Sequence, residues 1–497
     1  MRARYHIHYV FLLILFPSGL LLGCGTTLNL VTGETQRGAY SWQEEVQIGR
    51  EADPQIIAQF GLYNDAALTA YVERVAQAVL QTSAYSDPNT PAEIRNTPFH
   101  FRVLDSPVVN AMALPGGYIY VTRGLLAHLD NEAQLAVVLG HEIGHVLARH
   151  ASRRAASAQL GQFGLLGAAV LGGVLGGGNV AEGILNYGGT GVQLLFLSYS
   201  RNDEREADRA GVAYAEFAGY DAAEAADFFG SLARLSQQGG GGGIPSFLST
   251  HPDPGERQQT IPQLAAQYSP PGTEVNEAEY LSQIDNIIIG NDPQQGYAEG
   301  GRFYHPQLRF QFTYPNGWQV NNTPSAVQIS EPNGRAVVEF SFAQASSAQA
   351  AGQEFGNQQG VSVSSQRSAT VNGNRAYRLE GTANTNDGQV GFVVYFIEYG
   401  GNVYRFMGLA GASTFSSYSG AMRSSIESFS RLTSQSHINR QPVRLDVVPA
   451  NRSATFLSFL SGRPTPDGYS IEGLAIMNQV QLNSTVPTGY RLKLPTR

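Results

Sequence analysis

The stretch EAQLAVVLGHEIGHVLARHAS, residues 132–152, has apolar residues at helical spacing and follows two residues that favour a helix start. It is therefore expected to form a helix. His141 and His145 are four residues apart, so both imidazoles share one helical face and can bind one ion. Zinc favours imidazole ligands in tetrahedral geometry. Glu142 is not a ligand but lies beside the open coordination position, where it can act as the catalytic base.

A third protein ligand has to come from elsewhere, because a catalytic zinc ion usually binds three side chains and one water. Glu204 and Asp208 are four residues apart on a helix expected over about 202–218. Glu204 is the expected ligand, and Asp208 is expected to accept the free ring N–H of a ligand histidine, with His141 as the partner. One alternative is Glu206, which points about 200° round the helix from Glu204. The other is a solvated helix face whose acidic groups pair with nearby arginines.

The wider pattern around these residues resembles a known peptidase family, the HtpX/BepA/Ste24-type zinc metallopeptidases (metallopeptidase family forty-eight, gluzincins). The segments that carry the resemblance are 110–117 (NAMALPGG), 139–145 (LGHEIGH), 199–201 (YSR) and 204–208 (EREAD). The resemblance covers about residues 44–265 and implies a mainly helical zinc endopeptidase domain with a small sheet. Within the family it favours the soluble periplasmic branch that resembles BepA, which is associated with quality control of outer-membrane proteins.

The segment 110–122 is expected to contact the substrate. It has the form of a glycine turn followed by an edge strand just before the metal-binding helix. An extended peptide could add to such a strand through backbone hydrogen bonds. Asn110, Gly116, Gly117 and Tyr118 are the expected contacts. The alternative is an ordinary core strand.

His251, followed by Pro252 and Arg257, matches a downstream element of the same family and is expected to act at the metal. The resemblance implies either a fourth ligand in a latent state or a group that stabilises the oxyanion. The glycine run 239–243 would let this segment swing, and a mobile surface loop is the alternative. His150 is expected on the surface or in support of a ligand. The remaining histidines with no ligand spacing are expected to be structural: His100, His128, His305 and His437.

The N-terminus predicts export and lipidation. Residues 1–24, MRARYHIHYVFLLILFPSGLLLGC, combine a positive start with a short apolar run that ends in a cysteine. Residues 1–23 are expected to be a signal peptide ending in a lipobox, with Cys24 as the lipidated residue. Gly25 after the cysteine favours the outer membrane, so the expected location is the periplasm, anchored to that membrane. The alternative is an ordinary signal peptide beside an incidental cysteine.

The composition limits the kinds of molecule that the chain can be expected to bind. The chain has 497 residues, a formal net charge of -8 and one cysteine. The acidic balance argues against nucleic acid as a partner, and a lone cysteine cannot form an internal disulfide. Zinc is the expected cofactor, with no organic cofactor. Protein or peptide substrates, and a membrane through Cys24, are the expected partners.

The length predicts several domains in an α+β chain. The zinc metallopeptidase domain is expected over 44–268. Strand signals replace helix signals near residue 298, and residues 298–434 resemble the PsbP/Mog1-like α/β domains. Residues 440–497 form a small α/β unit whose end resembles part of a LysM repeat, which makes peptidoglycan a further predicted partner. The Gly-rich segment 161–197 is expected as a buried hairpin beside the active site, with membrane insertion as the alternative.

Two functions therefore compete at this point. The first is a zinc-dependent endopeptidase of the bacterial cell envelope that cleaves misfolded or unassembled envelope proteins. The second is a zinc-stabilised, largely inactive lipoprotein that acts as a chaperone or binds peptidoglycan, held shut by His251.

Overall fold

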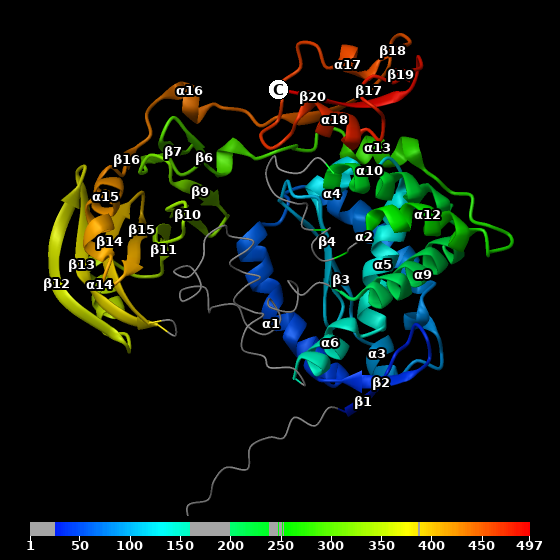
Figure 1. Cartoon of the computed structure of the whole chain (residues 1–497), viewed down its shortest axis with the longest axis horizontal. Coiled ribbons are helices and arrows are strands. Elements are labelled where there is room, and N and C mark those ends of the chain that lie inside the picture. The colour runs from blue at the N-terminus through cyan, green and yellow to red at the C-terminus, as the bar shows by residue number, and fades with distance from the viewer. Residues whose placement is uncertain (1–24, 160–198, 238–246, 248–250, 252, 386–387) are drawn as a thin grey trace, which may run out of the picture.

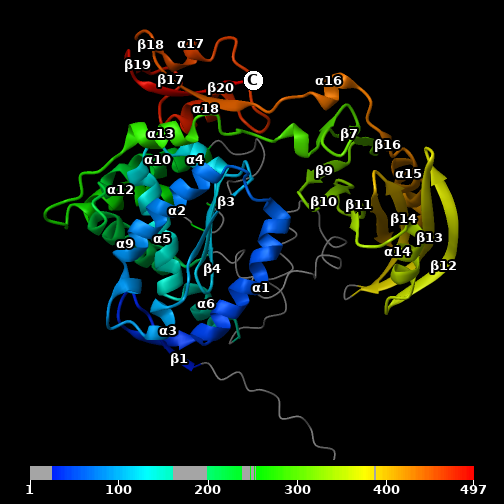
Figure 2. The same ribbon diagram turned by 180° about the vertical axis from the view of Figure 1, so that it is seen from behind.

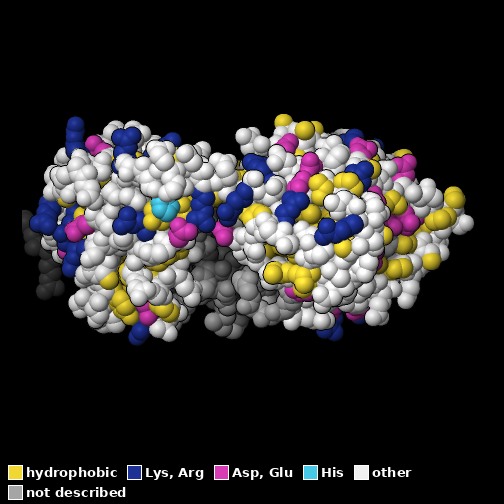
Figure 3. All heavy atoms as spheres, turned by 90° about the horizontal axis from the view of Figure 1, so that it is seen from above, with side chains coloured by type: hydrophobic (Ala, Val, Ile, Leu, Met, Phe, Trp, Pro, Cys, Tyr) yellow, Lys and Arg dark blue, Asp and Glu magenta, His cyan; other side chains and the backbone are white. Residues whose placement is uncertain are grey.

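Two bodies lie side by side, one rich in helices and one built on a large sheet (Figure 1). The computed structural model describes residues 25–159, 199–237, 247, 251, 253–385 and 388–497. Figure 2 shows the same arrangement from behind, and Figure 3 shows charged side chains of both signs interspersed over the upper face. Helices and strands each make up a large part of the described chain, which confirms the predicted α+β class.

Three expectations fall outside the described residues: the signal segment with Cys24, the Gly-rich segment 161–197 and the glycine run 239–243. Within the described ranges, no helix is long and apolar enough to span a bilayer.

The helix-rich body is built around α5 (Glu132–Leu147), whose residues are all buried. Asn131 begins this helix by accepting a hydrogen bond from the Gln134 N–H, as expected for an N-cap. The apolar side chains of α5 belong to one core that includes residues of the neighbouring helices and of a small sheet. The other helices of this body are α1 (Trp42–Phe60), α2 (Ala66–Gln81), α3 (Ala92–Arg95), α4 (Arg123–His128), α6 (His150–Gln159), α9 (Arg201–Phe217), α10 (Ala225–Gln237), α12 (Pro254–Ala265) and α13 (Glu277–Ile284), with 3₁₀ turns η1 (Ala84–Ser86) and η2 (Ala222–Glu224).

The helix expected over 132–152 is divided at Arg149, which has a φ of 56°. That left-handed conformation ends α5 and starts α6 in a new direction. The Arg149 guanidinium is buried, where it donates to Glu45 and to the Tyr40 carbonyl oxygen. Its pairing partner lies more than a hundred residues earlier, so helical periodicity alone does not show the break.

A three-stranded sheet beside α5 corrects one expectation. Its order is β3-β5-β4, with β3 (His100–Leu104) parallel and β4 (Ala111–Leu114) antiparallel to β5 (Tyr118–Thr122). The strand after the glycine turn is therefore the central strand, and the prediction of an edge strand there is wrong. The strand that precedes the turn, β4, lies at one edge of the sheet and packs against α5. The residue pattern within 117–122 predicts a strand but not its position in the sheet, because that position depends on pairing with β3.

A short N-terminal hairpin docks on the end of the helix-rich body where α5 ends. It consists of β1 (Gly25–Leu28) and β2 (Thr35–Gly38), paired antiparallel. Figures 1 and 2 place this hairpin and the C-terminal unit at opposite ends of the body.

The second body is a seven-stranded antiparallel sheet with one helix on each face. Alternate residues of β14 belong to different cores: Val394 packs with α14 (Ala348–Gly356), and Tyr395 belongs to the core that includes α15 (Phe415–Glu427). The strands of this sheet are β9 (Gln319–Asn322), β10 (Ala326–Ser330), β11 (Ala336–Ala343), β12 (Val361–Val371), β13 (Asn374–Thr385), β14 (Gly388–Tyr399) and β15 (Asn402–Gly411). A four-stranded sheet and two short helical segments accompany it: β6 (Tyr297–Glu299), β7 (Arg302–His305), β8 (Phe310–Thr313), β16 (Ser430–Arg431), η3 (Pro293–Gln295) and α16 (Gln435–Ile438).

Residues 440–497 pack onto the helix-rich body. β17 (Arg444–Pro449) pairs antiparallel with β20 (Arg491–Thr496), and their apolar side chains join the core around α5. Lys493 is 1% exposed, and its Nζ donates to the carbonyl oxygens of Ala127 (2.9 Å) and Leu129 (3.0 Å) and pairs with Asp130 at 2.6 Å. The core of this body therefore extends well beyond residues 44–268. The remaining elements of the unit are β18 (Ala454–Thr455), α17 (Phe456–Phe459), α18 (Ile471–Met477) and β19 (Thr485–Val486).

Candidate metal centre

Helices α5 and α9 approach each other closely because glycines face each other where they pack. A Cβ atom at Gly140 would lie 2.9 Å from the Gly211 carbonyl oxygen, and one at Gly211 would lie 2.8 Å from the His141 backbone nitrogen. Neither distance leaves room for a side chain, so the contact requires glycine. The first turn of α9 starts at the N-cap Ser200 and carries Glu204. The close packing allows this carboxylate to reach the histidines of α5.

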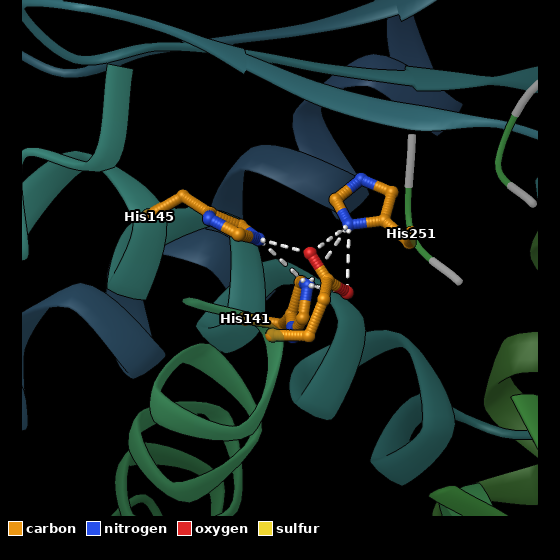
Figure 4. A group of neighbouring side chains, drawn as sticks. His141, His145 and His251 are labelled. Atoms are coloured by element: carbon orange, nitrogen blue, oxygen red, sulfur yellow. Dashed lines mark hydrogen bonds and ion pairs between the residues drawn. The ribbon is translucent and has the colours of Figure 1, made fainter. Parts of the chain in front are cut away.

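Four ligand atoms from three segments converge. His141 Nε2 lies 2.9 Å from His145 Nε2 and 3.2 Å from His251 Nδ1. Glu204 Oε1 lies 3.4 Å from His145 Nε2 and 3.1 Å from His251 Nδ1, and Glu204 Oε2 lies 3.6 Å from His141 Nε2. Figure 4 shows the three rings gathered around one point. Atoms that bind zinc tetrahedrally at about 2.0–2.1 Å lie about 3.3–3.4 Å apart, so this donor set fits a zinc ion.

His141, His145 and Glu204 have the protonation states that a metal requires, whereas the pKa of His251 is raised, because the carboxylates of Glu204 and Glu142 outweigh the effect of burial. Burial holds the pKa values of His141 and His145 well below the usual range, so both imidazoles are neutral. Burial alone would raise the pKa of Glu204, but the adjacent His251 and His145 lower it well below its usual range. Neutral imidazoles and an ionised carboxylate are the forms that bind divalent metals.

Glu142 is a buried carboxylate that accepts no hydrogen bond from the part of the chain that the structure describes. It is 0% exposed. The His251 Nε2 atom lies 3.6 Å from Glu142 Oε1. Burial raises the pKa of Glu142 to about 7. An unsatisfied buried carboxylate is costly, and a water or substrate group beside the metal would relieve this cost.

Asp208 contacts His141 on the ring nitrogen that faces away from the ligand cluster. Its Oδ1 atom lies 2.9 Å from His141 Nδ1, the contact expected from the sequence. Arg257 Nη2 donates to the same oxygen at 2.5 Å, and the guanidinium carbon lies 3.9 Å from the centroid of the Phe229 ring. An acceptor at Nδ1 keeps the proton there and leaves Nε2 free to bind metal. From the sequence, Arg257 is only a neighbour of His251. Its contact with Asp208 depends on the packing of α12, which the sequence does not show.

His150 and Glu206 lie behind His145 in the way that Asp208 lies behind His141. His145 Nδ1 lies 2.7 Å from His150 Nδ1, and His150 Nε2 lies 3.4 Å from Glu206 Oε1. His150 is 0% exposed, so the surface position allowed by the sequence is wrong and the supporting position is the one found. Glu206 faces His150, whereas Glu204 faces the ligand cluster. The histidines expected to be structural are not members of the cluster: His100, His128, His305 and His437.

His251 lies inside the ligand cluster, against an aromatic ring. The Phe247 ring stacks on it at 4.6 Å between centroids, and the Phe247 carbonyl oxygen accepts the His251 backbone N–H at 2.7 Å. The Tyr199 ring stacks on His145 at 3.9 Å. His251 is 1% exposed, which differs from the mobile surface loop considered from the sequence.

The expected substrate contacts are only partly near the cluster. Gly116 and Gly117 have φ values of 77° and 92°, and a Cβ at Gly116 would lie 2.4 Å from Val46 Cα. Their role in this structure is to let the turn pack against α1 and Phe99. The Tyr118 ring stacks on His100, and Asn110 is 7% exposed. A narrow groove beside the metal cluster is instead lined by residues from the end of β4 and from α5 and its surroundings, among them Ala113, Leu114, Pro115, His145 and Tyr199.

Comparisons with known proteins agree with this geometry. Residues 67–265 match Peptidase family M48. The chain is 29% identical over 292 residues to the beta-barrel assembly-enhancing protease of Escherichia coli (strain K12), covering 54% of this chain and 57% of that protein. It is 36% identical over 161 residues to the mitochondrial metalloendopeptidase OMA1 of Arabidopsis thaliana, covering 32% of this chain and 30% of that protein. The chain therefore spans little more than half the length of the E. coli relative.

Solved structures similar to part of the chain were also found. Cyanobacterial PsbP from Synechocystis sp. PCC 6803 aligns with 27% of this chain and 98% of its own, at 15% identity and a TM-score of 0.23. A TM-score this low leaves the PsbP/Mog1-like assignment of residues 298–434 as a prediction. The family match, by contrast, supports the predicted metallopeptidase family for residues 67–265.

Proposed function

We propose that the chain is a zinc-dependent endopeptidase of the bacterial cell envelope, in agreement with the match of residues 67–265 to Peptidase family M48. The observation that carries the proposal is the position of Glu204. Its carboxylate comes from a different helix, yet it lies 3.4 Å and 3.6 Å from the Nε2 atoms of His145 and His141. The proposal assigns these three residues as metal ligands.

The same site supports a hydrolytic mechanism. A zinc ion bound there would polarise the scissile carbonyl and lower the pKa of water. Glu142, with its buried carboxylate, accepts the proton of the attacking water and then delivers it to the leaving amine. A carboxyl group with a pKa of about 7 can perform both transfers near neutral pH. Asp208 holds the proton at His141 Nδ1 throughout.

The substrate follows the edge strand in this proposal. β4 lies at one edge of the sheet, and the end of β4 lines the groove that also contains His145. An extended peptide that pairs with this edge would pass close to Glu142 and bind mainly through its backbone. Backbone recognition suits unfolded chains of varied sequence. We therefore assign misfolded or unassembled envelope proteins as the substrate class.

The proposed location is the periplasmic side of the outer membrane, with Cys24 as the lipidated residue. Strand β1 begins at Gly25, directly after Cys24. An anchor at Cys24 would therefore hold the metal centre close to the membrane, with no long linker between them. The name of the E. coli relative, beta-barrel assembly-enhancing protease, agrees with this setting.

Metal removal tests the proposal directly. The protein from residue 25 to 497 should contain one zinc ion and cleave unfolded casein. Incubation with 1,10-phenanthroline should abolish cleavage, and added Zn²⁺ should restore it, because the three ligands hold the ion that activates water. The measurements are metal analysis and a fluorescent casein assay. Cleavage that persists in metal-free protein would contradict the zinc mechanism.

The position of His251 predicts a latent enzyme. Its Nδ1 atom lies within 3.2 Å of ligand atoms from both His141 and Glu204, so it would compete with water for a metal ion bound there. A His251→Ala variant should therefore raise basal casein cleavage, by about tenfold if the open site is populated about a tenth of the time. His437→Ala, in the sheet-rich body, is the matched control and should have wild-type activity. A fall in rate for His251→Ala would instead indicate that His251 stabilises the oxyanion.

The closed ligand set also supports a second candidate function. A site with four protein ligands resembles a structural zinc site, which stabilises a fold without catalysis. The chain would then act as a zinc-stabilised chaperone or as a peptidoglycan-binding lipoprotein. Equal inertness of wild-type protein and His251→Ala towards unfolded envelope proteins, with zinc bound in both, would favour this second candidate.

A further inference from the structure

The N-terminal strap, defined as residues 25–40, lies at one end of a chain of contacts that leads to the metal centre. We propose that Asn29 of this strap, acting through Glu206 and His150, is a positioning residue for the ligand His145. Docking of the strap and zinc affinity are then coupled. This inference rests on the proposed function, because it requires a metal ion at the ligand cluster.

The strap first satisfies the backbone at the end of the metal-binding helix. The last carbonyl groups of a helix have no partner within the helix. The Leu30 N–H donates to the Leu147 carbonyl oxygen at 3.1 Å, and Gln36 Nε2 donates to the Ala148 carbonyl oxygen at 2.7 Å. The Ala39 N–H donates to the Ser152 carbonyl oxygen at 3.2 Å. The strap thus holds the junction between α5 and α6, where the chain turns at Arg149.

The Asn29 side chain is locked in one orientation. Its Oδ1 atom accepts the backbone N–H groups of Val31 at 2.9 Å and Thr32 at 3.2 Å, which fixes the turn between β1 and β2. The Nδ2 group therefore points the other way and donates to Glu206 Oε1 at 2.5 Å. Asn29 is only 2% exposed, so this contact is shielded from water.

The chain of contacts continues from Glu206 to the ligand. Glu206 Oε1 lies 3.4 Å from His150 Nε2, and His150 Nδ1 lies 2.7 Å from His145 Nδ1. When His145 binds metal through Nε2, its proton is on Nδ1 and is donated to His150 Nδ1. His150 then carries its own proton on Nε2, which faces the Glu206 carboxylate. The Asn29 amide holds this carboxylate in place.

This arrangement has a thermodynamic consequence. Outer contacts of this kind orient a metal-bound histidine, and their loss commonly lowers metal affinity about 10–100-fold. Any coupling is reciprocal, so zinc binding should also favour docking of the strap. The strap lies between the predicted anchor residue, Cys24, and the ligand His145.

The test compares isosteric variants of the detergent-extracted full chain. Asn29→Asp keeps the acceptor for Val31 and Thr32 but replaces the donor with a second carboxylate facing Glu206. It should lower zinc affinity about tenfold, measured by competition with a chromophoric chelator. Thr32→Asp adds the same charge to the exposed turn and should have wild-type affinity. Asn29→Asp combined with Glu206→Gln exchanges donor and acceptor and should recover most of the affinity.

A second readout separates positioning from general stability. In the cobalt-substituted protein, the visible absorption bands report ligand geometry; they should change in Asn29→Asp and return in the exchanged pair. If Asn29→Asp fails to fold, His150→Phe provides the same comparison and should lower zinc affinity at least tenfold. Wild-type zinc affinity in Asn29→Asp or, where that variant does not fold, in His150→Phe would overturn the inference. Absence of zinc from the wild-type chain would instead overturn the proposed function.

Discussion

A Glu142→Gln variant should bind zinc normally and cleave unfolded casein at least about a thousandfold more slowly than wild-type protein. Glutamine has almost the same shape as glutamate, but its amide cannot accept a proton. General acid–base groups contribute about 10²–10⁴-fold to rate, and Glu142 performs both transfers in the proposed mechanism. Metal affinity should not change, because Glu142 is outside the ligand set.

The same variant should be more stable than wild type in metal-free form. The pKa of Glu142 is raised from 4.5 to about 7 by burial, so the folded state disfavours the carboxylate. The resulting penalty on folding grows between pH 4.5 and pH 7 and is complete above pH 7. Glu142→Gln removes it and should raise the free energy of unfolding at pH 8 by up to about 3 kcal/mol. Urea denaturation in the presence of a chelator measures this gain.

Glu45 offers the matched control for Glu142. It is another buried glutamate near the metal helix whose pKa burial raises to about 7, but it pairs with Arg149 at 2.7 Å. Glu45→Gln should therefore lower stability through Arg149 and leave the chemical step unchanged in the protein that remains folded. Substantial cleavage by Glu142→Gln with zinc bound would remove Glu142 from the mechanism.

Lys493→Met should destabilise the helix-rich body, although Lys493 lies close to the C-terminus. The variant leaves Asp130 without its cation and leaves the Ala127 and Leu129 carbonyl oxygens without their donor. Removal of one partner from a fully buried ion pair costs about 3–5 kcal/mol. The Asp130 side chain is 23% exposed, so the expected loss is at the lower end, about 3 kcal/mol. Arg491→Met, on an exposed side chain of the same strand, should cost less than about 0.5 kcal/mol.

The two tryptophans of the chain allow this loss to be located. Trp42 is buried in the helix-rich body, and Trp318 belongs to the sheet-rich body. In a Trp318→Phe background, Trp42 fluorescence alone should report the lower urea midpoint of Lys493→Met. An unchanged Trp42 transition would show that residues 440–497 form an independent unit. The double variant Lys493→Met with Asp130→Leu should recover stability, because no charge then remains unpaired.

Much of the candidate site was predictable because it depends on spacing within single helices. His141 and His145 share a face because helical residues four apart are neighbours, and the same rule relates Glu204 to Asp208. Prediction of the Asp208 contact with His141 needed one further assumption, that two helices with complementary residues pack together. The glycines that allow this packing, Gly140 and Gly211, are visible in the sequence, but nothing there shows that they face each other.

Strand order was not predictable in the same way. Residues 117–122 have the alternation and composition of a strand, and the structure has a strand there. Whether that strand is central or at an edge depends on partners elsewhere in the chain, and β3 occupies the side that the prediction left open. The break at Arg149 is a similar case, because its buried partner Glu45 belongs to α1.

The sequence by itself therefore determined the metal-binding helix, the shared face of His141 and His145 and the α+β composition, because each of these follows from local spacing and residue type. The choice of Glu204 over Glu206 depended on how α9 packs against α5. Tertiary structure alone decided that β4 lies at an edge, that His150 and Asn29 lie behind His145, and that residues 440–497 share the core around α5. These features arise from contacts between residues far apart in the chain. Their stability depends on burial and on the pairing of polar groups, and neither has a periodic signature along the sequence.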